Sequence, residues 1–253
     1  MKPVAILRHD PLQGPGYLLD FLVRHGIPHR LFAIDAGDTP PTRASEFSGV
    51  VVLGSPASVN DGLLWMRREE RLLVDALHLS VPILGHCFGG QMLARALGAE
   101  VRRNPVPQIG WGRVFVTQFD ESRRWFGPRR ELQLFHWHYE TFAIPRGARR
   151  VLFGSYCMNK GFAYGPHLGV QSHLEVTEAT VRSWCAQGVS EIADHAGPAV
   201  QDAADLLADL PAKVAALHCI ADQVYGQWAS RLARPVLLRP HGGEGWGRAL
   251  NGG

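Results

Sequence analysis

Short apolar runs alternate with helix-like segments along the first hundred residues, and this alternation constrains the fold more than any other feature. The apolar runs are rich in β-branched residues and cover residues 4–9, 30–35, 47–56 and 81–87. The helix-like segments have an apolar residue every three to four positions and cover residues 16–26, 64–79 and 88–98. Strands that alternate with helices pair in parallel through right-handed crossovers. The pattern therefore predicts an α/β fold, with a doubly wound, mostly parallel sheet flanked by helices.

The pattern changes after about residue 100. Short β-branched or aromatic runs, broken by Gly and Pro, cover residues 110–119, 131–144, 148–155 and 161–175. They predict further strands, some of them antiparallel. Helical sequence returns after Glu175, over residues 177–195 and about 212–232.

The last predicted helix carries one apolar stripe, formed by Val214, Leu217, Ala221, Val224, Trp228 and Leu232. We expect this stripe to pack on the protein's own body; a homodimer or partner surface is the alternative. The chain is therefore predicted to have one domain over residues 1–190 and a helical C-terminal extension over residues 191–253. The extension ends in a Gly-rich tail that we expect to be disordered.

Composition excludes several classes of protein. A formal net charge of +3 over 253 residues argues against a nucleic acid or a membrane surface as partner. No apolar run reaches the ~18 residues of a membrane span, and the first residues lack the pattern of a signal peptide. The four cysteines (Cys87, Cys157, Cys185 and Cys219) are far apart and lack metal-type spacing. We expect reduced thiols in a cytoplasmic protein that has neither a metal nor another cofactor.

One of these cysteines stands where a predicted strand passes into a predicted helix. The sequence "GHCFG" (85–89) is a G-x-C-x-G form of the nucleophile elbow, in which glycines permit a tight turn that exposes the central side chain. The N–H groups at the start of the helix then face a developing negative charge, and the same helix end favours the thiolate. A buried structural cysteine is the alternative interpretation of Cys87.

A second segment supplies a base and a carboxylate. In "GVQSHLEV" (169–176), His173 and Glu175 are two residues apart near the end of a predicted strand. Side chains at positions i and i+2 of an extended segment point to the same side, so Glu175 could orient the imidazole while the imidazole faces a thiol. A surface pair is the alternative. His86 lies next to Cys87 on its strand and is expected to face away from the site.

Together, "PILGHCFGGQMLARALGAEV" and "GVQSHLE" resemble the signatures of the class I glutamine amidotransferases, which run close to G-x-C-x-G-x-Q and G-x-Q-F-H-P-E. The resemblance covers most of residues 1–190 and implies the flavodoxin-like fold of that family. The chain is similar to stand-alone members, of either the GMP-synthase-amidotransferase type or the γ-glutamyl-peptidase type. The resemblance implies a triad of Cys87 as nucleophile, His173 as general base and acid, and Glu175 as the residue that orients it.

The resemblance also implies residues that contact the substrate. The segment "VVLGSPASVND" (51–61) is similar to the family's G-G-P-x-S loop, which places Gly54 and Ser55 at the oxyanion hole, with the N–H of Phe88 as the second donor. Gln91 matches a glutamine that contacts the substrate. The segment "FHWHYETF" (135–142) resembles one that borders the family's substrate site, which places His138 nearby.

The chain departs from the family pattern at several positions. Ser172 and Leu174 replace the usual Phe and Pro of F-H-P-E, and Tyr139-Glu140 replaces the Gly-Asp that follows the second histidine. Ser55 replaces the second glycine of the oxyanion loop, and its Cβ disfavours a positive φ. These changes concern the fit of the substrate and the geometry of the loop, while all three triad side chains are retained.

The reaction implied is hydrolysis of the side-chain amide of glutamine to glutamate and ammonia through a γ-glutamyl thioester. The 78 residues after Glu175 contain no G-x-x-x-x-G-K-[ST] phosphate loop, so we expect a separate synthetase to accept the ammonia. The main alternative is a stand-alone γ-glutamyl peptidase that acts on glutathione-like compounds. A non-catalytic homologue that binds a partner, and a metal site at His136 and His138, are further alternatives.

Overall fold

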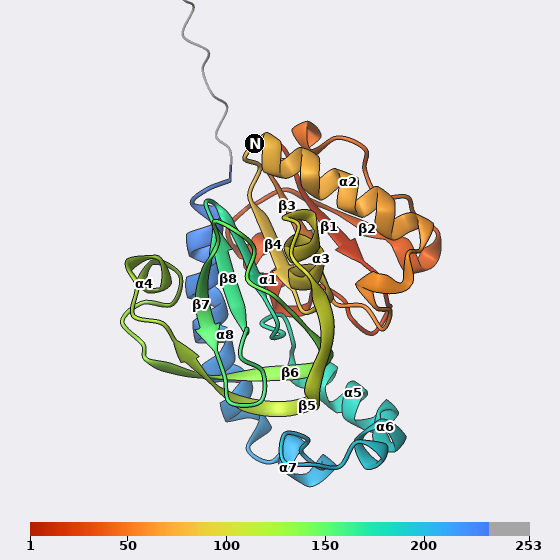
Figure 1. Cartoon of the computed structure of the whole chain (residues 1–253), viewed down its shortest axis with the longest axis vertical. Coiled ribbons are helices and arrows are strands. Elements are labelled where there is room, and N and C mark those ends of the chain that lie inside the picture. The colour runs from red at the N-terminus through yellow and green to blue at the C-terminus, as the bar shows by residue number, and fades with distance from the viewer. Residues whose placement is uncertain (233–253) are drawn as a thin grey trace, which may run out of the picture.

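The computed structural model describes residues 1–232, which form a nine-stranded mixed sheet with helices on both faces (Figure 1). The strands lie in the order β2-β1-β3-β4-β9-β8-β7-β5-β6. Their bounds are β1 (Val4–Arg8), β2 (His29–Ala33), β3 (Gly49–Val52), β4 (Ile83–His86), β5 (Val101–Val116), β6 (Glu131–Phe142), β7 (Arg149–Phe153), β8 (Gly161–Tyr164) and β9 (His167–Val170). The Gly-rich tail expected at the end of the chain lies outside the described residues.

Eight α-helices accompany the sheet within residues 1–232. They are α1 (Gly16–Arg24), α2 (Leu64–His78), α3 (Phe88–Ala96), α4 (Asp120–Phe126), α5 (Glu178–Gln187), α6 (Val189–Asp194), α7 (Ala203–Leu207) and α8 (Leu210–Ala229). Short 3-10 turns occupy Ile34–Ala36, Ala44–Glu46 and Val59–Asp61. Within the same residues, no helix is both long and apolar enough to cross a membrane.

The alternation of strands and helices predicted for the first hundred residues is confirmed. Strands β2, β1, β3, β4 and β9 are parallel neighbours, whereas β8, β7, β5 and β6 pair in antiparallel fashion, as expected for the second half. Three details differ from the prediction: α4 and α7 were not foreseen, β5 begins nine residues early, and the helix expected over 177–195 divides at Gly188. A Cβ at Gly188 would come within 2.5 Å of the Trp137 ring, so close packing accompanies this break.

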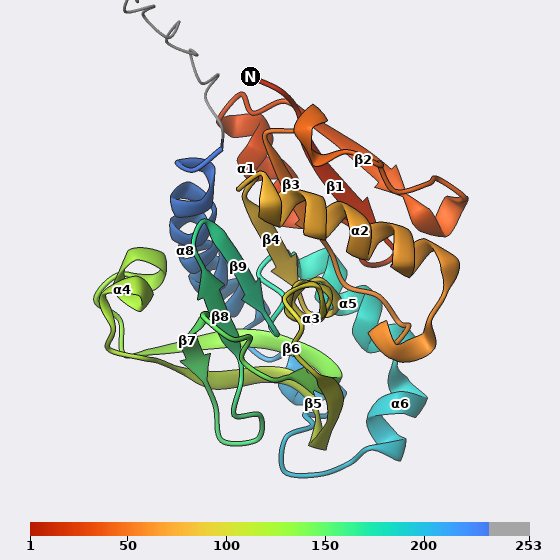
Figure 2. The same cartoon turned by 45° about the horizontal axis from the view of Figure 1, so that its top comes forward.

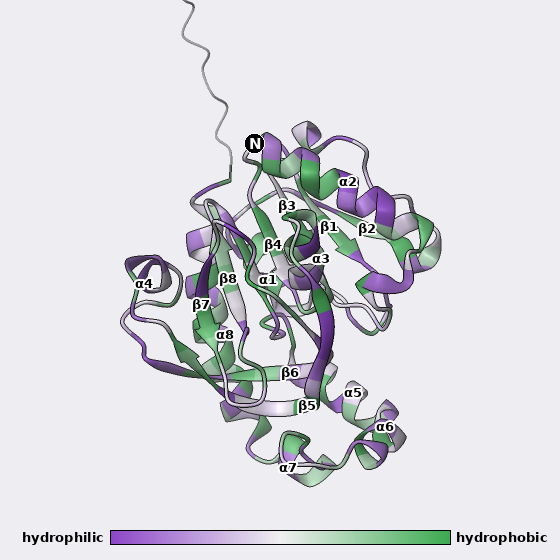
Figure 3. Ribbon diagram, viewed as in Figure 1, coloured by the Kyte–Doolittle hydropathy of each residue, from purple (hydrophilic) through white to green (hydrophobic). Residues whose placement is uncertain are grey.

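Both faces of the inner parallel strands β1, β3, β4 and β9 are buried, which explains their nearly continuous apolar runs. Along β1, Val4 and Ile6 belong to a core shared with α1 and α8, whereas Ala5 and Leu7 belong to a second core shared with α2 and α3. Figure 3 shows β3 and β4 as mainly hydrophobic, while α2 carries hydrophobic and hydrophilic residues in turn. The helices therefore cover the sheet with one apolar side each.

Helix α8 is part of the main core. All six residues of its predicted stripe are buried, so the expectation that the stripe packs on the protein's own body is confirmed. Figures 1 and 2 show α8 running along the back of the sheet, where it packs against α1 and α4. The Tyr225 ring meets Phe21 of α1 edge-on at 5.5 Å, and Tyr17 donates a hydrogen bond to Asp222 at 2.9 Å.

The pairing of β4 with β9 determines where the candidate site forms. The two strands are parallel, with Gly85 opposite Gly169 and His86 opposite Val170. Their carboxyl ends therefore open at the same edge of the sheet, and the residues that follow each strand come together there. Cys87 follows β4, and His173 follows β9.

Because α8 shares the core of the sheet, truncation of its buried face should destabilise the whole protein. We expect Leu217→Ala, at a fully buried position, to lower the free energy of unfolding by about 2–5 kcal/mol in urea titrations. The matched control is Cys219→Ala on the exposed side of the same helix, which should change stability by less than about 0.5 kcal/mol. Equal effects of the two variants would contradict this role of α8.

Candidate active site

Cys87 occupies a strained turn between β4 and α3. Its φ of 50° and ψ of −109° lie in a region that non-glycine residues rarely adopt. Two backbone hydrogen bonds hold the turn: the Cys87 N–H donates to Val170 O at 2.8 Å, and its carbonyl accepts from Gln91 N at 3.1 Å. The surrounding fold thus imposes the conformation that the elbow motif predicts.

The glycines of the elbow are required by close packing of backbone on backbone. A Cβ at Gly89 would clash with the carbonyl oxygen of Val52 on β3, and one at Gly90 would lie 2.6 Å from Val170 O on β9. Without these side chains, the first turn of α3 sits directly against the edge of the sheet. Cys87 is the N-cap residue of α3, so it stands directly before the first turn of this helix.

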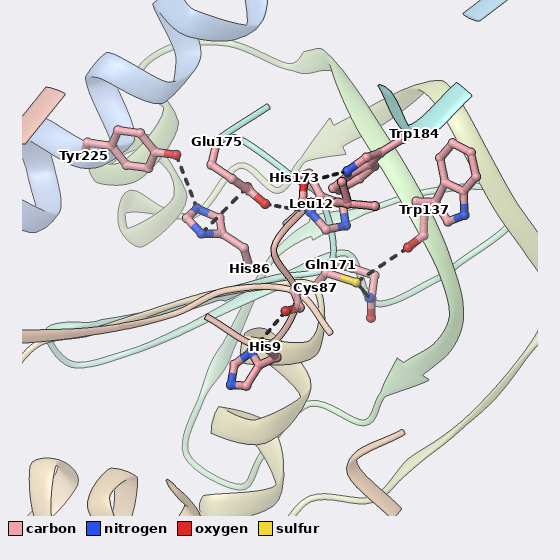
Figure 4. A network of polar contacts seen from close by, with 11 residues as sticks. His9, Leu12, His86, Cys87, Trp137, Gln171, His173, Glu175, Trp184 and Tyr225 are labelled. Atoms are coloured by element: carbon pink, nitrogen blue, oxygen red, sulfur yellow. Dashed lines mark hydrogen bonds and ion pairs between the residues drawn. The ribbon is translucent and has the colours of Figure 1, made fainter. Parts of the chain in front are cut away.

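The Cys87 side chain lines a cavity of about 350 Å³ and is 6% exposed. Its sulfur accepts a hydrogen bond from Gln171 Nε2 at 3.6 Å and lies 3.7 Å from the carbonyl oxygen of Trp137, to which the thiol can donate (Figure 4). The thiol is therefore held by groups from both β6 and the segment after β9. A purely structural cysteine would have no need to face a cavity.

His173 lies in the wall of the same cavity, close enough to Cys87 for the sulfur to affect its titration. The segment after β9 is irregular, and a single β-bridge to Phe135 on β6 holds it in place. In this bridge the His173 N–H donates to Phe135 O at 2.9 Å. The imidazole Nδ1 lies 2.7 Å from Glu175 Oε1, and Trp184 packs edge-on against the ring at 4.9 Å. The predicted convergence of Cys87, His173 and Glu175 on one place is present in the structure.

The charges around His173 favour the protonated form of its imidazole. Burial opposes the charged form, but the Glu175 carboxylate and the Cys87 sulfur outweigh it and raise the pKa of His173 to about 10. Burial also opposes ionisation of Glu175, yet the facing rings of His86 and His173 hold the pKa of that carboxyl below its usual value. The pair is therefore an ion pair inside the protein.

His86 extends the group on the far side of Glu175. Its Nδ1 lies 3.8 Å from Glu175 Oε2, and its Nε2 lies 3.5 Å from the hydroxyl of Tyr225 on α8. Burial lowers the pKa of His86, although the Glu175 carboxylate opposes this shift. As expected from the alternation of a strand, His86 faces the opposite side of the sheet from the cavity (Figure 4).

The residues expected at the oxyanion hole surround the thiol. Ser55, Phe88, Gln91 and His138 line the cavity, and a Cβ on Gly54 would come 3.0 Å from His173 Cε1. Ser55 does not adopt a positive φ, so its Cβ creates no strain at the position where the family has glycine. Phe88 is the first residue of α3, where an N–H has no partner within its helix.

Gln91 and His138 support the cavity wall through the backbone of β6. Gln91 Nε2 donates to Glu140 O and to Gln171 Oε1, both at 3.3 Å, and His138 Nδ1 lies 2.9 Å from Glu140 O. Their side-chain nitrogens are therefore engaged with protein groups. In this arrangement Gln91 and His138 shape the pocket through Glu140 and Gln171.

Among the described residues, His136 and His138 have no third candidate ligand for a metal ion. The buried Lys160 ammonium lies 3.3 Å from His136 Nδ1 and 3.0 Å from His138 Nε2, and it also donates to Gln108. Burial and the Lys160 charge lower the pKa of both rings well below the usual value, which leaves them neutral acceptors. In the described part of the chain, no cluster of three or more His, Cys, Asp or Glu side chains could hold a metal ion.

Several residues of the cavity were not singled out from the sequence. Gln171 contacts the Cys87 sulfur. The sequence could have identified it, because Gln171 is the Gln of the G-x-Q-F-H-P-E pattern. The rim has Tyr139, which donates a hydrogen bond to Glu191, and Arg103, whose guanidinium lies 5.9 Å from the Tyr139 ring. Charged rim residues from β5, β6 and α6 meet only through the tertiary structure, so no local pattern could identify them.

The comparisons with known proteins agree with the fold. The family model described as glutamine amidotransferase class-I matches residues 18–186. A crystal structure of a glutamine amidotransferase from Methylobacillus flagellatus has 39% sequence identity and a TM-score of 0.90, and the match covers 92% of this chain and 96% of that one. A glutamine amidotransferase structure from Thermotoga maritima has 26% identity and a TM-score of 0.81, over 90% of this chain and 97% of that one.

The chain therefore belongs to the class I glutamine amidotransferases. The glutamine amidotransferase-like protein YfeJ of Salmonella typhimurium is 26% identical over 203 residues, which are 77% of this chain and 84% of that protein. The GMP synthase of Aeropyrum pernix is 34% identical over 132 residues, but the match spans 51% of this chain and only 24% of that protein. The similarity to this GMP synthase thus covers only about a quarter of the length of that enzyme.

The ion pair of His173 and Glu175 predicts a pH-dependent contribution to stability. Because the pKa of His173 is raised from 6.5 to about 10, this contribution is complete below about pH 6.5 and is lost as the pH rises toward 10. We expect Glu175→Gln to lower the free energy of unfolding by about 3–5 kcal/mol at neutral pH, and this loss to shrink as the pH approaches 10. Urea unfolding of both proteins between pH 6 and pH 10 measures it.

The matched control for this pH dependence is Glu140→Gln. The Glu140 carboxylate accepts a hydrogen bond from Ser58 at 2.9 Å, and no histidine within residues 1–232 pairs with it. The change in the free energy of unfolding caused by Glu140→Gln should stay constant over the same pH range. A constant difference between the wild type and Glu175→Gln would mean that His173 holds no extra proton in the folded state.

Proposed function

We propose that the protein hydrolyses the side-chain amide of glutamine to glutamate and ammonia, with Cys87 as nucleophile, His173 as proton carrier and Glu175 as the group that orients it. The observation that carries the proposal is the meeting of a strained cysteine elbow and a buried His–Glu ion pair in one cavity. Membership of the class I glutamine amidotransferases supports the same reaction.

Each step uses a group that lines or borders the cavity. The Cys87 thiolate, whose proton has already passed to the imidazole of His173, attacks the amide carbon. His173 gives this proton to the departing nitrogen as the carbon–nitrogen bond breaks, which releases ammonia and leaves a γ-glutamyl thioester. Water, deprotonated by the same imidazole, then attacks the thioester and frees glutamate and the Cys87 thiolate, with the proton again on His173. The raised pKa of His173 favours the state in which the ring holds the proton before it is transferred.

The oxyanion formed in both attacks needs hydrogen-bond donors. The N–H groups of Ser55 and Phe88 are the proposed donors, and the proposal is supported by two observations: both residues line the cavity with Cys87, and Phe88 begins a helix. Loss of one such donor typically costs about 3 kcal/mol of transition-state stabilisation. The loop at Gly54 and Ser55 is therefore as necessary to the proposed reaction as the thiol.

The rim of the cavity offers both signs of charge to an amino-acid substrate. Asp10, Glu140 and Glu191 supply carboxylates, and Arg103 supplies a guanidinium. A free amino acid carries an ammonium and a carboxylate at its α-carbon, so a rim of mixed charge is complementary to it. This charge pattern supports glutamine, or the γ-glutamyl end of a larger compound, as the substrate.

The ammonia is proposed to pass to a separate acceptor enzyme. Some relatives are themselves single subunits of a larger enzyme. One of them belongs to the glutamine-hydrolysing GMP synthase of Saccharolobus solfataricus and is 31% identical over 46% of this chain and 59% of that protein. The likeness supports an arrangement in which the amidotransferase and the acceptor are different polypeptides.

The proposal predicts a defined loss of activity for each triad variant. Cys87→Ala should abolish release of ammonia and glutamate, and His173→Ala should do nearly the same. Glu175→Ala should retain a slow remnant, about 10³- to 10⁴-fold below the wild type, because an orienting group is partly dispensable. A coupled glutamate assay measures the rates, and intact-mass analysis after acid quenching detects the thioester on Cys87. Cys185→Ala, a buried thiol on α5, is the control and should be fully active.

The leaving group is tested with a second substrate. The same acyl chemistry would release an amine from a γ-glutamyl dipeptide, so both substrates should be assayed at matched concentrations. A higher kcat/KM for the dipeptide would assign the protein as a γ-glutamyl peptidase. Unchanged turnover in Cys87→Ala, or no turnover and no thioester with either substrate, would contradict the proposed function.

A further inference from the structure

A second buried His–Glu pair lies behind the oxyanion loop. His9 follows β1, and its Nε2 lies 2.9 Å from Oε2 of Glu69 on α2; the two side chains are 1% and 0% exposed. The other ring nitrogen, Nδ1, lies 3.0 Å from the carbonyl oxygen of Gly54 (Figure 4). A carbonyl oxygen only accepts, so Nδ1 carries a proton and donates it to Gly54.

The His9 ring also touches Phe88, the residue whose N–H is the second proposed oxyanion donor. It packs against the Phe88 ring with centroids 5.0 Å apart, and it stacks on Trp65 at 5.0 Å and 25°. One imidazole therefore contacts Phe88, whose N–H begins α3, and the carbonyl of Gly54 in the oxyanion loop. No other described side chain donates a hydrogen bond to the Gly54 carbonyl.

Burial of this pair is expensive, which argues that it does more than fill space. Glu69 is completely buried, and its Oε1 lacks a hydrogen-bond partner among the described residues. A buried ion pair with an unpaired oxygen contributes little net stability, and apolar residues of similar volume often serve better. The neighbours of the pair on α2 are apolar, so an apolar pair would fit the local core.

The geometry of the peptide explains what the hydrogen bond achieves. The Gly54–Ser55 peptide is trans, so its N–H points away from the carbonyl that His9 holds. That N–H belongs to Ser55, which lines the cavity with Cys87. Within residues 1–232, the Ser55 N–H has no backbone or side-chain acceptor, so the peptide would be free to rotate if the carbonyl were not held.

We propose that His9 and Glu69 are positioning residues: the His9 Nδ1–H fixes the Gly54 carbonyl, and Glu69 orients the ring, so that the Ser55 N–H is aimed at the oxyanion on the substrate carbon. The pair never touches the substrate. The inference rests on the proposed function in that it takes Cys87 as the nucleophile, but it holds for any acyl group that Cys87 accepts.

The test separates formation of an oxyanion from reactivity of the sulfur. Acylation of Cys87 by p-nitrophenyl acetate passes through a tetrahedral oxyanion and releases p-nitrophenolate, whereas alkylation by iodoacetamide is a direct displacement without one. Both rates are measured at one pH on the full-length protein, with Cys87→Ala subtracted as background. The ratio of the two rates reports on the oxyanion hole alone.

Three variants and one control are compared. His9→Leu removes the donor to Gly54, His9→Gln replaces the ring with a neutral amide donor, and Glu69→Gln removes the orienting charge. Leu72→Ala is the control: it removes a completely buried side chain one turn further along α2, so it destabilises the same helix without removing the hydrogen bond to Gly54. Thermal unfolding of each variant establishes that the measurements are made on folded protein.

The expected result is a selective loss of acylation. His9→Leu should lower the acylation rate about 10- to 100-fold, because a displaced oxyanion donor costs that much, and leave the alkylation rate within about twofold. Glu69→Gln should give a smaller loss, His9→Gln should restore part of the rate, and Leu72→Ala should preserve the ratio. With glutamine as substrate, the loss should appear in kcat with little change in KM.

Two results would overturn the inference. One is an unchanged ratio of acylation to alkylation in folded His9→Leu; the other is an equal fall of both rates, which would indicate a general disturbance of the site. Neither result depends on glutamine turnover, because p-nitrophenyl acetate needs only the thiol and the oxyanion hole. A wild type that is acylated by the ester but does not turn over glutamine would instead contradict the proposed function and leave the test of His9 intact.

Discussion

The structure depends on the close contact between the first turn of α3 and the edge of the parallel sheet. Gly89 and Gly90 have no side chains, so the helix start rests on the carbonyl oxygens of β3 and β9. This contact forces Cys87 into a positive φ and directs its sulfur into the cavity. The strain at one residue is stabilised by the many backbone hydrogen bonds of the strands around it. The cavity, the elbow and the helix end therefore form together.

The site is also a place where charge is buried in pairs. His173 with Glu175 and His9 with Glu69 lie on the two sides of the oxyanion loop, and each pair leaves one carboxylate oxygen without a hydrogen bond among the described residues. Because burial of ions costs free energy, such pairs are uncommon in an apolar core. Their concentration around Cys87 is what a reaction that moves a proton and creates an oxyanion would need.

Periodicity alone predicted most of the fold. The order of β1 to β4 and α1 to α3 follows from apolar alternation, and the buried stripe of α8 follows from its helical spacing. The break at Gly188 was not predicted, because the Trp137 ring that packs on it comes from a strand some 50 residues earlier. Helix α4 is only seven residues long and polar on its surface, too short for a periodic signal. The paired motifs located Cys87, His173 and Glu175, since each motif is local.

Sequence by itself determined the strand and helix types, the glycine elbow and the identity of the three side chains proposed as the triad, because these properties depend on residues near one another in the chain. Only the tertiary structure decided that β9 lies beside β4, although the two strands are about 80 residues apart and the intervening chain forms the antiparallel half of the sheet. That pairing brings His173 to Cys87. The tertiary structure likewise decided that Glu69 lies next to His9. The two residues are 60 positions apart and meet only because α2 packs on the sheet and buries both.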